Sequence, residues 1–574
     1  MRFTKLIRKQ EDIFIVTKTV DEAGKVLSLP VLTDSCEIDG CEAVFGDTSR
    51  DISKVAKAIL EKKLSEKKKL YKAINDLSGY LIYSDGVSVA VVWTDFQLCE
   101  AAVACFMKNA VGSSHSEGEI FSEFLSLSAY LKDREEKIIA DRWERLAGAI
   151  PTEFREDMIR EFKTLYSLFD YNAAAKWLGS LYDPETGGWY ATQSARAHEG
   201  FLPDLENTFY AFHSIVGILG MAEMFGDRWE KAMPEDLIMK SARWIQSLQA
   251  EDGYFYLPQW PKELIEKSGF QLRITRDVGS ATTFLTRAKL EPIYKRPEAG
   301  GSSSQSPSIL SQYESVESFG EYLRKLEGEL EGISDFDRAW KFYLWSSYFQ
   351  TTTQLLTDEM KEMTVEFFDK HQNPENGMWS NELHYHSTNG IHKIASVYNK
   401  LGRELKHADK IVNSTLKILT WDKETKPIPN TCDLYNVWSV FPYLYKNIRM
   451  TYPGTPEEKE ARCEAIKKLV FRGAAEAIRN SADQLKAYAR GGGTFSTFKV
   501  QKCGRPGFEM AINGTVEGDL PGFLFAAYDV PRHIFEALEL SDYELPYFTE
   551  HDRLIYVDTI RSMTPPKKLP VPNS

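Results

Sequence analysis

The sequence predicts a mainly α-helical protein, in which a small mixed α+β domain precedes a series of helical hairpins. The strongest observation is a turn of glycine followed by an aromatic or apolar residue, which recurs along the chain. Its copies contain Gly188, Gly253, Gly377 and Gly492, which are 65, 124 and 115 residues apart. These gaps fit one, two and two units of about 60 residues, a period typical of stacked helical hairpins.

Residues 1–145 contain no copy of this turn, and their pattern predicts the α+β domain. Two apolar runs, Tyr80–Tyr83 and Val87–Trp93, flank the turn signal at Asp85 and Gly86, which predicts a β-hairpin. Two further stretches predict helices, Ile52–Ile74 and Leu98–Met107. This part of the chain carries no motif that indicates a reaction.

Residues 146–545 predict the helical hairpins, because apolar residues recur there at three- and four-residue spacing. The predicted helices are Asp157–Leu168, Thr208–Met224, Asp236–Gln249, Trp340–Leu356, Met360–Lys370, Ile391–Leu401 and Ala461–Arg479. The low-complexity segment 297–307 predicts an exposed loop. Residues 546–574, which end in a proline-rich stretch, predict an extended C-terminal tail.

Composition and charge exclude several classes of partner. The formal net charge of −13 argues against nucleic acid, which would require a basic face. The chain has no apolar run long enough for a membrane span and no signal-peptide pattern. Seven scattered cysteines are typical of reduced thiols, so we expect a cytoplasmic protein. No phosphate loop, nucleophile elbow or HExxH motif occurs, and we expect no cofactor and no metal.

In each predicted hairpin, the turn is followed by a loop and then by a second helix, and these second helices open on polar clusters. The openings are Pro203–Thr208, Arg276–Thr283, His384–Gly390, Thr431–Trp438 and Asn513–Asp519. Helix N-termini favour anionic groups, because backbone N–H groups and the helix dipole point there. Arg273 and Arg276 also form a local basic pair that suits a sugar acid.

This alternation resembles the α/α-toroid superfamily over roughly residues 150–545. The stretches that carry the resemblance are Gly187–Tyr190 with Ser194–Arg196 and Pro203–Thr208, and Gly493–Ser496 with Gly514 and Glu517–Asp519. They are similar to bacterial proteins of the cyclase-repeat type. The superfamily contains terpenoid cyclases, protein prenyltransferases, six-hairpin glycosidases, polysaccharide lyases and sugar epimerases. The resemblance implies an (α/α) toroid whose second helices form an inner ring, with their openings at one end of a funnel.

Carboxylates at two of these openings suit glycoside hydrolysis. Asp204 and Glu206 can supply one half of an acid/base pair, and Glu517 or Asp519 the other half. Hydrolysis requires two carboxylates on opposite sides of the scissile bond. An alternative interpretation is helix capping, which is an ordinary role for an Asp such as Asp204 in this register.

The cluster His384-Tyr385-His386 suits a different reaction, the β-elimination of a uronic sugar. Such a lyase needs a base, an acid for the leaving oxygen and a group that neutralises the sugar carboxylate. Histidine or tyrosine can act as the base and tyrosine as the acid. The candidate neutralisers are Asn389, Asn436 and Arg490. The alternative interpretation is two exposed histidines flanking a buried tyrosine.

The sequence therefore predicts a carbohydrate-active enzyme that cleaves glycosidic bonds in small oligosaccharides, including those with uronic acids. It leaves open whether the enzyme is a glycoside hydrolase or a lyase. The residues expected to contact substrate are Arg196, Asn207, Asn389, Tyr435, Asn436, Trp438 and Arg490. Two alternatives remain, a non-catalytic toroid that binds a ligand and a terpenoid cyclase- or prenyltransferase-like enzyme. The latter can require zinc, for which Cys432, Asp433 and the histidines are ligand types without a compact spacing.

Overall fold

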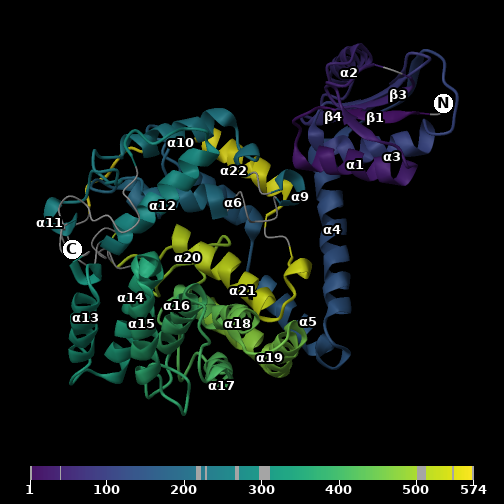
Figure 1. Cartoon of the computed structure of the whole chain (residues 1–574). Helices are drawn as coiled ribbons and strands as arrows, with labels where there is room; N and C mark the ends of the chain where they lie inside the picture. The colour runs from purple at the N-terminus through teal and green to yellow at the C-terminus, as the bar shows by residue number, and fades with distance from the viewer. Residues whose placement is uncertain are drawn as a thin grey trace. The chain divides into compact units, whose positions relative to one another are not determined.

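The computed structural model confirms a mainly helical chain with a small N-terminal α/β region (Figure 1). It describes residues 3–38, 40–214, 222–226, 229–265, 271–295, 311–500, 512, 514–545 and 548–571. The chain divides into two compact units. The first combines residues 1–141 with 216–233 and 549–554, and the second contains residues 142–215, 234–548 and 555–574. The predicted loop 297–307 lies outside the described residues.

The first unit is built on a six-stranded sheet of order β2-β1-β3-β5-β4-β6. The strands are β1 (Lys5–Arg8), β2 (Val31–Thr33), β3 (Glu42–Phe45), β4 (Leu77–Ser84), β5 (Val89–Trp93) and β6 (Gly118–Ser126). β1, β2, β3 and β5 run parallel, so the unit is more of an α/β fold than predicted. The predicted hairpin is confirmed, because β4 pairs antiparallel with β5.

Helices connect these strands, as parallel pairing requires. They are α1 (Phe14–Leu27), α2 (Asp51–Leu70) and α3 (Cys99–Asn109), with the short 3-10 turn η1 (Phe96–Leu98). Both helices predicted from the sequence here, α2 and α3, are confirmed. Every residue of β3, β4 and β5 is buried, which explains their apolar composition.

Two segments from much later in the chain complete the first unit. One contains α9 (Ala222–Phe225) and the turn η3 (Trp229–Lys231), and the ring of Phe225 lies 5.7 Å from that of Phe96. The other is the first turn of α22 (Glu550–Ser562), where Glu550 accepts a hydrogen bond of 2.8 Å from Gln97. Residues 1–145 alone therefore lack part of this unit.

The second unit is helical, and α4 (Leu127–Ala149) leads into it. Its longer helices are α5 (Thr152–Tyr166), α6 (Tyr171–Ser180), α10 (Glu235–Ser247), α12 (Gln271–Arg287), α13 (Val316–Gly328), α14 (Asp335–Thr352), α15 (Asp358–His371), α16 (Tyr385–Leu401), α17 (Ala408–Leu419), α18 (Thr431–Thr451), α19 (Pro456–Lys486) and α21 (Val530–Ala537). Its short elements are α7 (Gln193–Ala197), α8 (Leu205–Phe209), α11 (Lys262–Ile265), α20 (Leu520–Leu524), η6 (Ser311–Tyr313), η7 (Thr353–Leu355) and η9 (Ser541–Tyr543). α16 packs between α14 and α18, as Figure 1 shows.

Two predictions for this part of the chain need correction. The helix predicted over 208–224 is not a regular α-helix, because α8 passes into the π-helical segment η2 (Tyr210–Ser214). A second π-helical segment, η8 (Phe525–Asp529), follows α20 in the same way. The predicted extended tail 546–574 contains α22, and the described residues 563–571 that follow it belong to no helix or named strand. The apolar spacing of Leu554, Val557 and Ile560 supports this helix, but the proline-rich end of the tail concealed it.

The recurring turns share a backbone hydrogen bond, which spans five residues in the first and third copies and four in the second and fourth. In each, a backbone N–H spans the turn to a carbonyl: Asp183 to Gly188 (2.8 Å), Ala250 to Tyr254 (2.8 Å), Asn373 to Met378 (2.7 Å) and Arg490 to Thr494 (2.9 Å). The residue before each acceptor is a glycine with positive φ, namely Gly187, Gly253, Gly377 and Gly493. The equivalent glycines of the first and last copies are therefore Gly187 and Gly493, one residue from those that the sequence comparison aligned.

Three of these glycines, Gly187, Gly377 and Gly493, place their turns against another helix or its N-cap. A Cβ on Gly187 would lie 2.9 Å from the backbone nitrogen of Ser241 in α10, and one on Gly377 would lie 2.7 Å from that of Ile411 in α17. A Cβ on Gly493 would overlap the carbonyl oxygen of Asp170, the N-cap of α6. The last turn thus contacts the first helical hairpin.

Candidate functional site

The openings of the second helices surround a cavity of about 650 Å³. Its wall contains residues from α8, α12, α14, α16, α18 and α20, together with the segment after the last turn. Glu206 and His386 both line it, although they are far apart in the sequence. Four of the five predicted openings contribute residues to this wall. Asn513–Asp519 contributes none, and Arg276 lies inside α12, not at its start.

One side of the cavity is a platform of aromatic rings on α14. Trp340 and Tyr343 stack with their ring centroids 5.1 Å apart and their planes 28° apart. The imidazole of His386 meets this platform at 5.4 Å from the Trp340 ring. The ammonium group of Lys393 lies 5.1 Å from the centroid of the Tyr343 ring. An imidazole and a cation therefore flank two stacked rings.

His386 faces a buried carboxylate on the neighbouring helix. Its Nδ1 lies 3.9 Å from Oδ1 of Asp433, which is only 2% exposed. The amide of Asn389 donates a hydrogen bond to the same Oδ1, and its nitrogen is 3.3 Å from His386 Nδ1. Asn430 donates to the other oxygen of Asp433 at 2.8 Å. The two amides fix this carboxylate beside the imidazole.

Several buried polar atoms of the cavity wall have no hydrogen-bond partner among the described residues. They include Oδ1 of Asn389, Oδ1 of Asn436 and Nδ1 of His392. The two asparagines are 4% and 3% exposed. A buried polar atom without a partner is costly, so such atoms indicate bound water or a ligand with hydroxyl groups. Burial lowers the pKa of His392 well below its usual value, which keeps this imidazole neutral.

The cysteine on the wall is not an activated nucleophile. Burial raises the pKa of Cys432 to about 11, so its sulfur remains a thiol. Within the described part of the chain, one group of carboxylates, Glu460, Glu464 and Glu539, has the spacing of metal ligands. Arg449 forms ion pairs with two of its members, and none of the three lines the cavity. Cys432 and Asp433 do not belong to any such group.

Glu206 is the one predicted carboxylate on the cavity wall, and it is held by arginines. Its Oε2 accepts a hydrogen bond of 2.7 Å from Arg273, and its Oε1 lies 3.6 Å from Arg276. Arg273 also pairs with Asp204 at 2.6 Å and with Asp277 at 3.1 Å. Burial raises the pKa of Asp277 to about 7, and the charges of Asp204 and Glu206 add to this shift, whereas Arg273 opposes it. A Glu206 paired in this way is poorly suited to donate a proton.

Three other predicted carboxylates do not line the cavity, and they accept hydrogen bonds from backbone N–H groups. Asp204 caps α8 by accepting from the backbone N–H of Asn207 at 2.9 Å, which supports the capping interpretation. Asp519 caps α20 and also accepts from the backbone of Thr497 at 2.7 Å. Glu517 accepts from the backbone of Ser194 at 3.1 Å, and so ties the last hairpin to the first.

The histidine-tyrosine cluster separates around the start of α16. Tyr385 is buried, packs its ring against Trp421 and accepts a hydrogen bond of 3.2 Å from Gln484. His384 is the N-cap of α16, with its Nε2 3.8 Å from Asp335. Neither lines the cavity, so His386 is the member of the cluster that does.

Of the predicted substrate contacts, Asn389, Tyr435 and Asn436 line the cavity. The other four have structural contacts elsewhere: Trp438 donates to Ser481, Asn207 to Asp204, Arg196 to the carbonyls of Tyr182 and Thr564, and Arg490 to those of Phe498 and Lys499. Tyr343 and Lys393, which also line the cavity, were not among the residues predicted from the sequence. Their positions three residues after Trp340 and seven after His386 give the only signal that could have found them.

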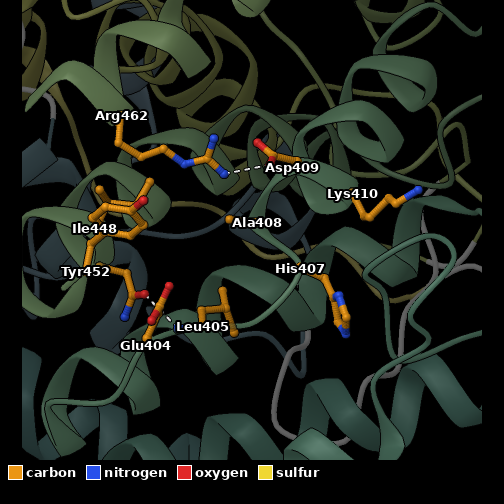
Figure 2. A pocket seen from close by; sticks show the side chains of 10 residues that line it. Glu404, Leu405, His407, Ala408, Asp409, Lys410, Ile448, Tyr452 and Arg462 are labelled. Atoms are coloured by element: carbon orange, nitrogen blue, oxygen red, sulfur yellow. Dashed lines mark hydrogen bonds and ion pairs between the residues drawn. The ribbon is translucent and has the colours of Figure 1, made fainter. Parts of the chain in front are cut away.

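A second, smaller cavity of about 290 Å³ lies at the start of α17, beside α18 and α19 (Figure 2). Arg462 and Asp409 form an ion pair of 2.7 Å across it. Asn447 accepts a hydrogen bond of 2.9 Å from the backbone of Leu405. None of the predicted site residues lines this cavity.

A scan against protein-family models and searches of curated proteins and of solved structures found no match to this chain. Among the described residues, no helix combines the length and the apolar character that crossing a membrane requires. The cavity is therefore the feature from which a function can be inferred.

Proposed function

We propose that the hairpins of the second unit close into an (α/α) toroid around the large cavity. The shared geometry of the four turns supports this proposal, because it makes the hairpins equivalent units. The contact of Gly493 with Asp170 supports closure, since it joins the last unit to the first. A hydrogen bond of 2.9 Å from Leu520 to the carbonyl of Ala191 adds a second link between them.

We further propose that the cavity binds and cleaves a carbohydrate. The observation that carries this proposal is the pair of buried, unpartnered amide oxygens of Asn389 and Asn436 beside stacked aromatic rings. Sugar hydroxyls can donate to such oxygens, and the apolar C–H face of a sugar ring packs well on an aromatic ring. A wholly apolar substrate such as a terpenoid would leave both amide oxygens without a donor.

The proton-transfer groups on the wall favour β-elimination. In this reaction the imidazole of His386 removes the proton at C5 of a uronic sugar. A C4–C5 double bond forms, the C4–O bond breaks, and the leaving oxygen takes a proton from the hydroxyl of Tyr343. Asp433 stabilises the imidazolium that forms. Atoms and charge balance without an oxidant or a reductant.

Hydrolysis is the second candidate, because two carboxylates, Glu206 and Asp337, also line the cavity. Asp337 is exposed and accepts a hydrogen bond of 2.6 Å from Ser334, so it can exchange with solvent. The ion pairs of Glu206 with Arg273 and Arg276 favour its ionised form, which has no proton to donate as a general acid. For this reason we favour elimination.

The test is incubation of the full chain with short oligouronates and with neutral oligosaccharides. Elimination gives an unsaturated sugar acid whose conjugated double bond absorbs ultraviolet light, whereas hydrolysis gives new reducing ends without this absorbance. We expect the absorbance to rise with oligouronates. Reducing ends alone would assign a hydrolase. Binding without any product would assign a non-catalytic module.

A further inference from the structure

Lys393 is a cation of the cavity wall that no carboxylate of the described residues neutralises. Among the described residues it forms no ion pair, and its one specific contact is with the ring of Tyr343 at 5.1 Å. Arg276, the other cation of the wall, differs because it pairs with Glu206. An ammonium group in such a place gains strongly from an anion, since burial has already removed much of its water.

The position of Lys393 relative to His386 is fixed by α16. The two residues are seven apart, which is two helical turns on one face and about 10 Å along the axis. Asn389 lies between them on the same face and presents its unpartnered oxygen. The ammonium group of Lys393 and the imidazole of His386 therefore lie at separate positions on one wall of the cavity.

The aromatic platform connects these two places. Trp340 contacts His386 and Tyr343 contacts Lys393, and the two rings stack on each other. A disaccharide lying on this platform would have the C5–H of one ring at the imidazole and the anionic group of the neighbouring ring at the ammonium group. The second unpartnered oxygen, on Asn436, belongs to the neighbouring helix α18 and lines the same cavity.

We propose that Lys393 forms an anion subsite, which binds the carboxylate or phosphate of an acidic sugar while its hydroxyls donate to Asn389 and Asn436. This deepens the proposed function and rests on it, because it names the charge of the substrate and where that charge binds. Burial lowers the pKa of Lys393, and Arg276 lowers it further. A bound anion would reverse this effect and keep the ammonium protonated.

The test is calorimetric titration of the full chain with three monosaccharide probes, D-glucuronate, D-glucose 6-phosphate and D-glucose. We expect the anionic probes to bind more tightly than glucose. Lys393→Gln should weaken them by about 10-fold or more and leave glucose unchanged, because a hydrogen bond to a charged group is lost. The control is Lys400→Gln, on the same helix but exposed, where Lys400 donates to the carbonyl of Gln350.

The two anionic probes separate the two sources of charge. Tighter binding of glucuronate assigns a sugar acid, and tighter binding of glucose 6-phosphate assigns a sugar phosphate. Equal affinity for all three probes, or an unchanged affinity in Lys393→Gln, would overturn the subsite while leaving a carbohydrate site intact. Binding of the anions without any turnover of oligosaccharides would instead remove the proposed reaction and keep the subsite. If no probe binds, both proposals fall.

Discussion

Oδ1 of Asp433 lies 3.9 Å from Nδ1 of His386, although the two residues come from different hairpins. The separation is slightly longer than a hydrogen bond, and the amide of Asn389 bridges it by contacting both atoms. The carboxylate is thus ready to stabilise a positive charge on the imidazole. This relationship makes His386 the group to change first.

His386→Ala should reduce turnover of the oligosaccharide by about 10² to 10⁴, the usual contribution of a general acid or base. Asp433→Asn should also lower kcat, because the imidazolium loses its charged partner. Steady-state kinetics on the substrate found in the oligosaccharide screen would measure both. The control is His407→Ala, an exposed histidine at the second cavity, which should retain full activity. Activity that survives His386→Ala would remove the imidazole from the reaction.

Arg273→Met should lower the free energy of unfolding by about 3 to 5 kcal/mol, because it leaves buried carboxylates without a charged partner. Arg273 is 4% exposed and pairs with Asp204, Glu206 and Asp277. Urea unfolding followed by circular dichroism gives the comparison. Arg479→Ala, at an exposed position of α19, should stay within about 0.5 kcal/mol of the original protein. Similar stability of both variants would show that the buried network contributes little.

Gly493→Ala should destabilise the second unit. Gly493 has φ +71°, and a Cβ there would overlap the carbonyl oxygen of Asp170. We expect a loss of roughly 1 to 3 kcal/mol, measured by thermal or urea unfolding. Gly148→Ala is the matched control, because nothing lies within 4 Å of that Cβ and the residue is inside α4. It should stabilise by about 0.5 to 1 kcal/mol. An unchanged free energy of unfolding in Gly493→Ala would argue against tight contact between the last turn and the start of α6.

A fragment of residues 1–145 should fold less stably than the same residues in the full chain. It lacks α9 and the start of α22, whose Phe225 and Glu550 contact Phe96 and Gln97. Hydrogen exchange of strands β3 to β5 would compare the fragment with the full chain. Glu550→Gln in the full chain is a smaller change to the contact with Gln97. It should reduce hydrogen-exchange protection only near that contact. Equal protection in fragment and full chain would mean that the two later segments are dispensable.

The buried histidines should contribute stability that is lost as pH decreases below about 6.5, the usual pKa of histidine. Burial lowers the folded-state pKa of His392 and also that of His533, so the unfolded chain binds more protons in this range. The stabilisation is complete above the unfolded pKa and is lost as pH falls toward the folded one. His392→Gln should reduce the slope of unfolding free energy against pH, whereas His407→Gln should not. A slope that is identical in all three proteins would exclude His392 as its source.

The repeat pattern could be predicted because it depends on local chemistry. A turn position with positive φ favours glycine, so a glycine recurs at each turn. Trp189 and Trp379 occupy equivalent positions, two residues after Gly187 and Gly377. Each of these indoles donates to a carbonyl eleven residues earlier, at 3.2 and 2.8 Å. The β-hairpin at Asp85 was predictable for the same reason. Asp204 and Asp519 were identified as polar residues at helix openings. The sequence alone does not show whether such a residue caps the helix or takes part in catalysis.

The composition of the cavity wall was less predictable, because it depends on the rotation of each helix about its axis. One residue along α16 turns a side chain by about 100°. Tyr385 therefore faces Trp421, while His386 faces the cavity. Trp438 likewise enters the core and donates to Ser481, whereas Asn436 reaches the wall. Lys393 was missed because its lack of an ion-pair partner among the described residues can be recognised only once the neighbouring helices are in place.

The contact between Gly493 and Asp170 also has a consequence for biosynthesis. A nascent chain that has emerged from the ribosome as far as α18 already has most of its hairpins, but the flank of α6 still lacks the segment that covers it. Thr497 and Pro521 complete the cavity wall only after α19 has been translated. The cavity wall is therefore incomplete, and the flank of α6 uncovered, until these residues have been translated.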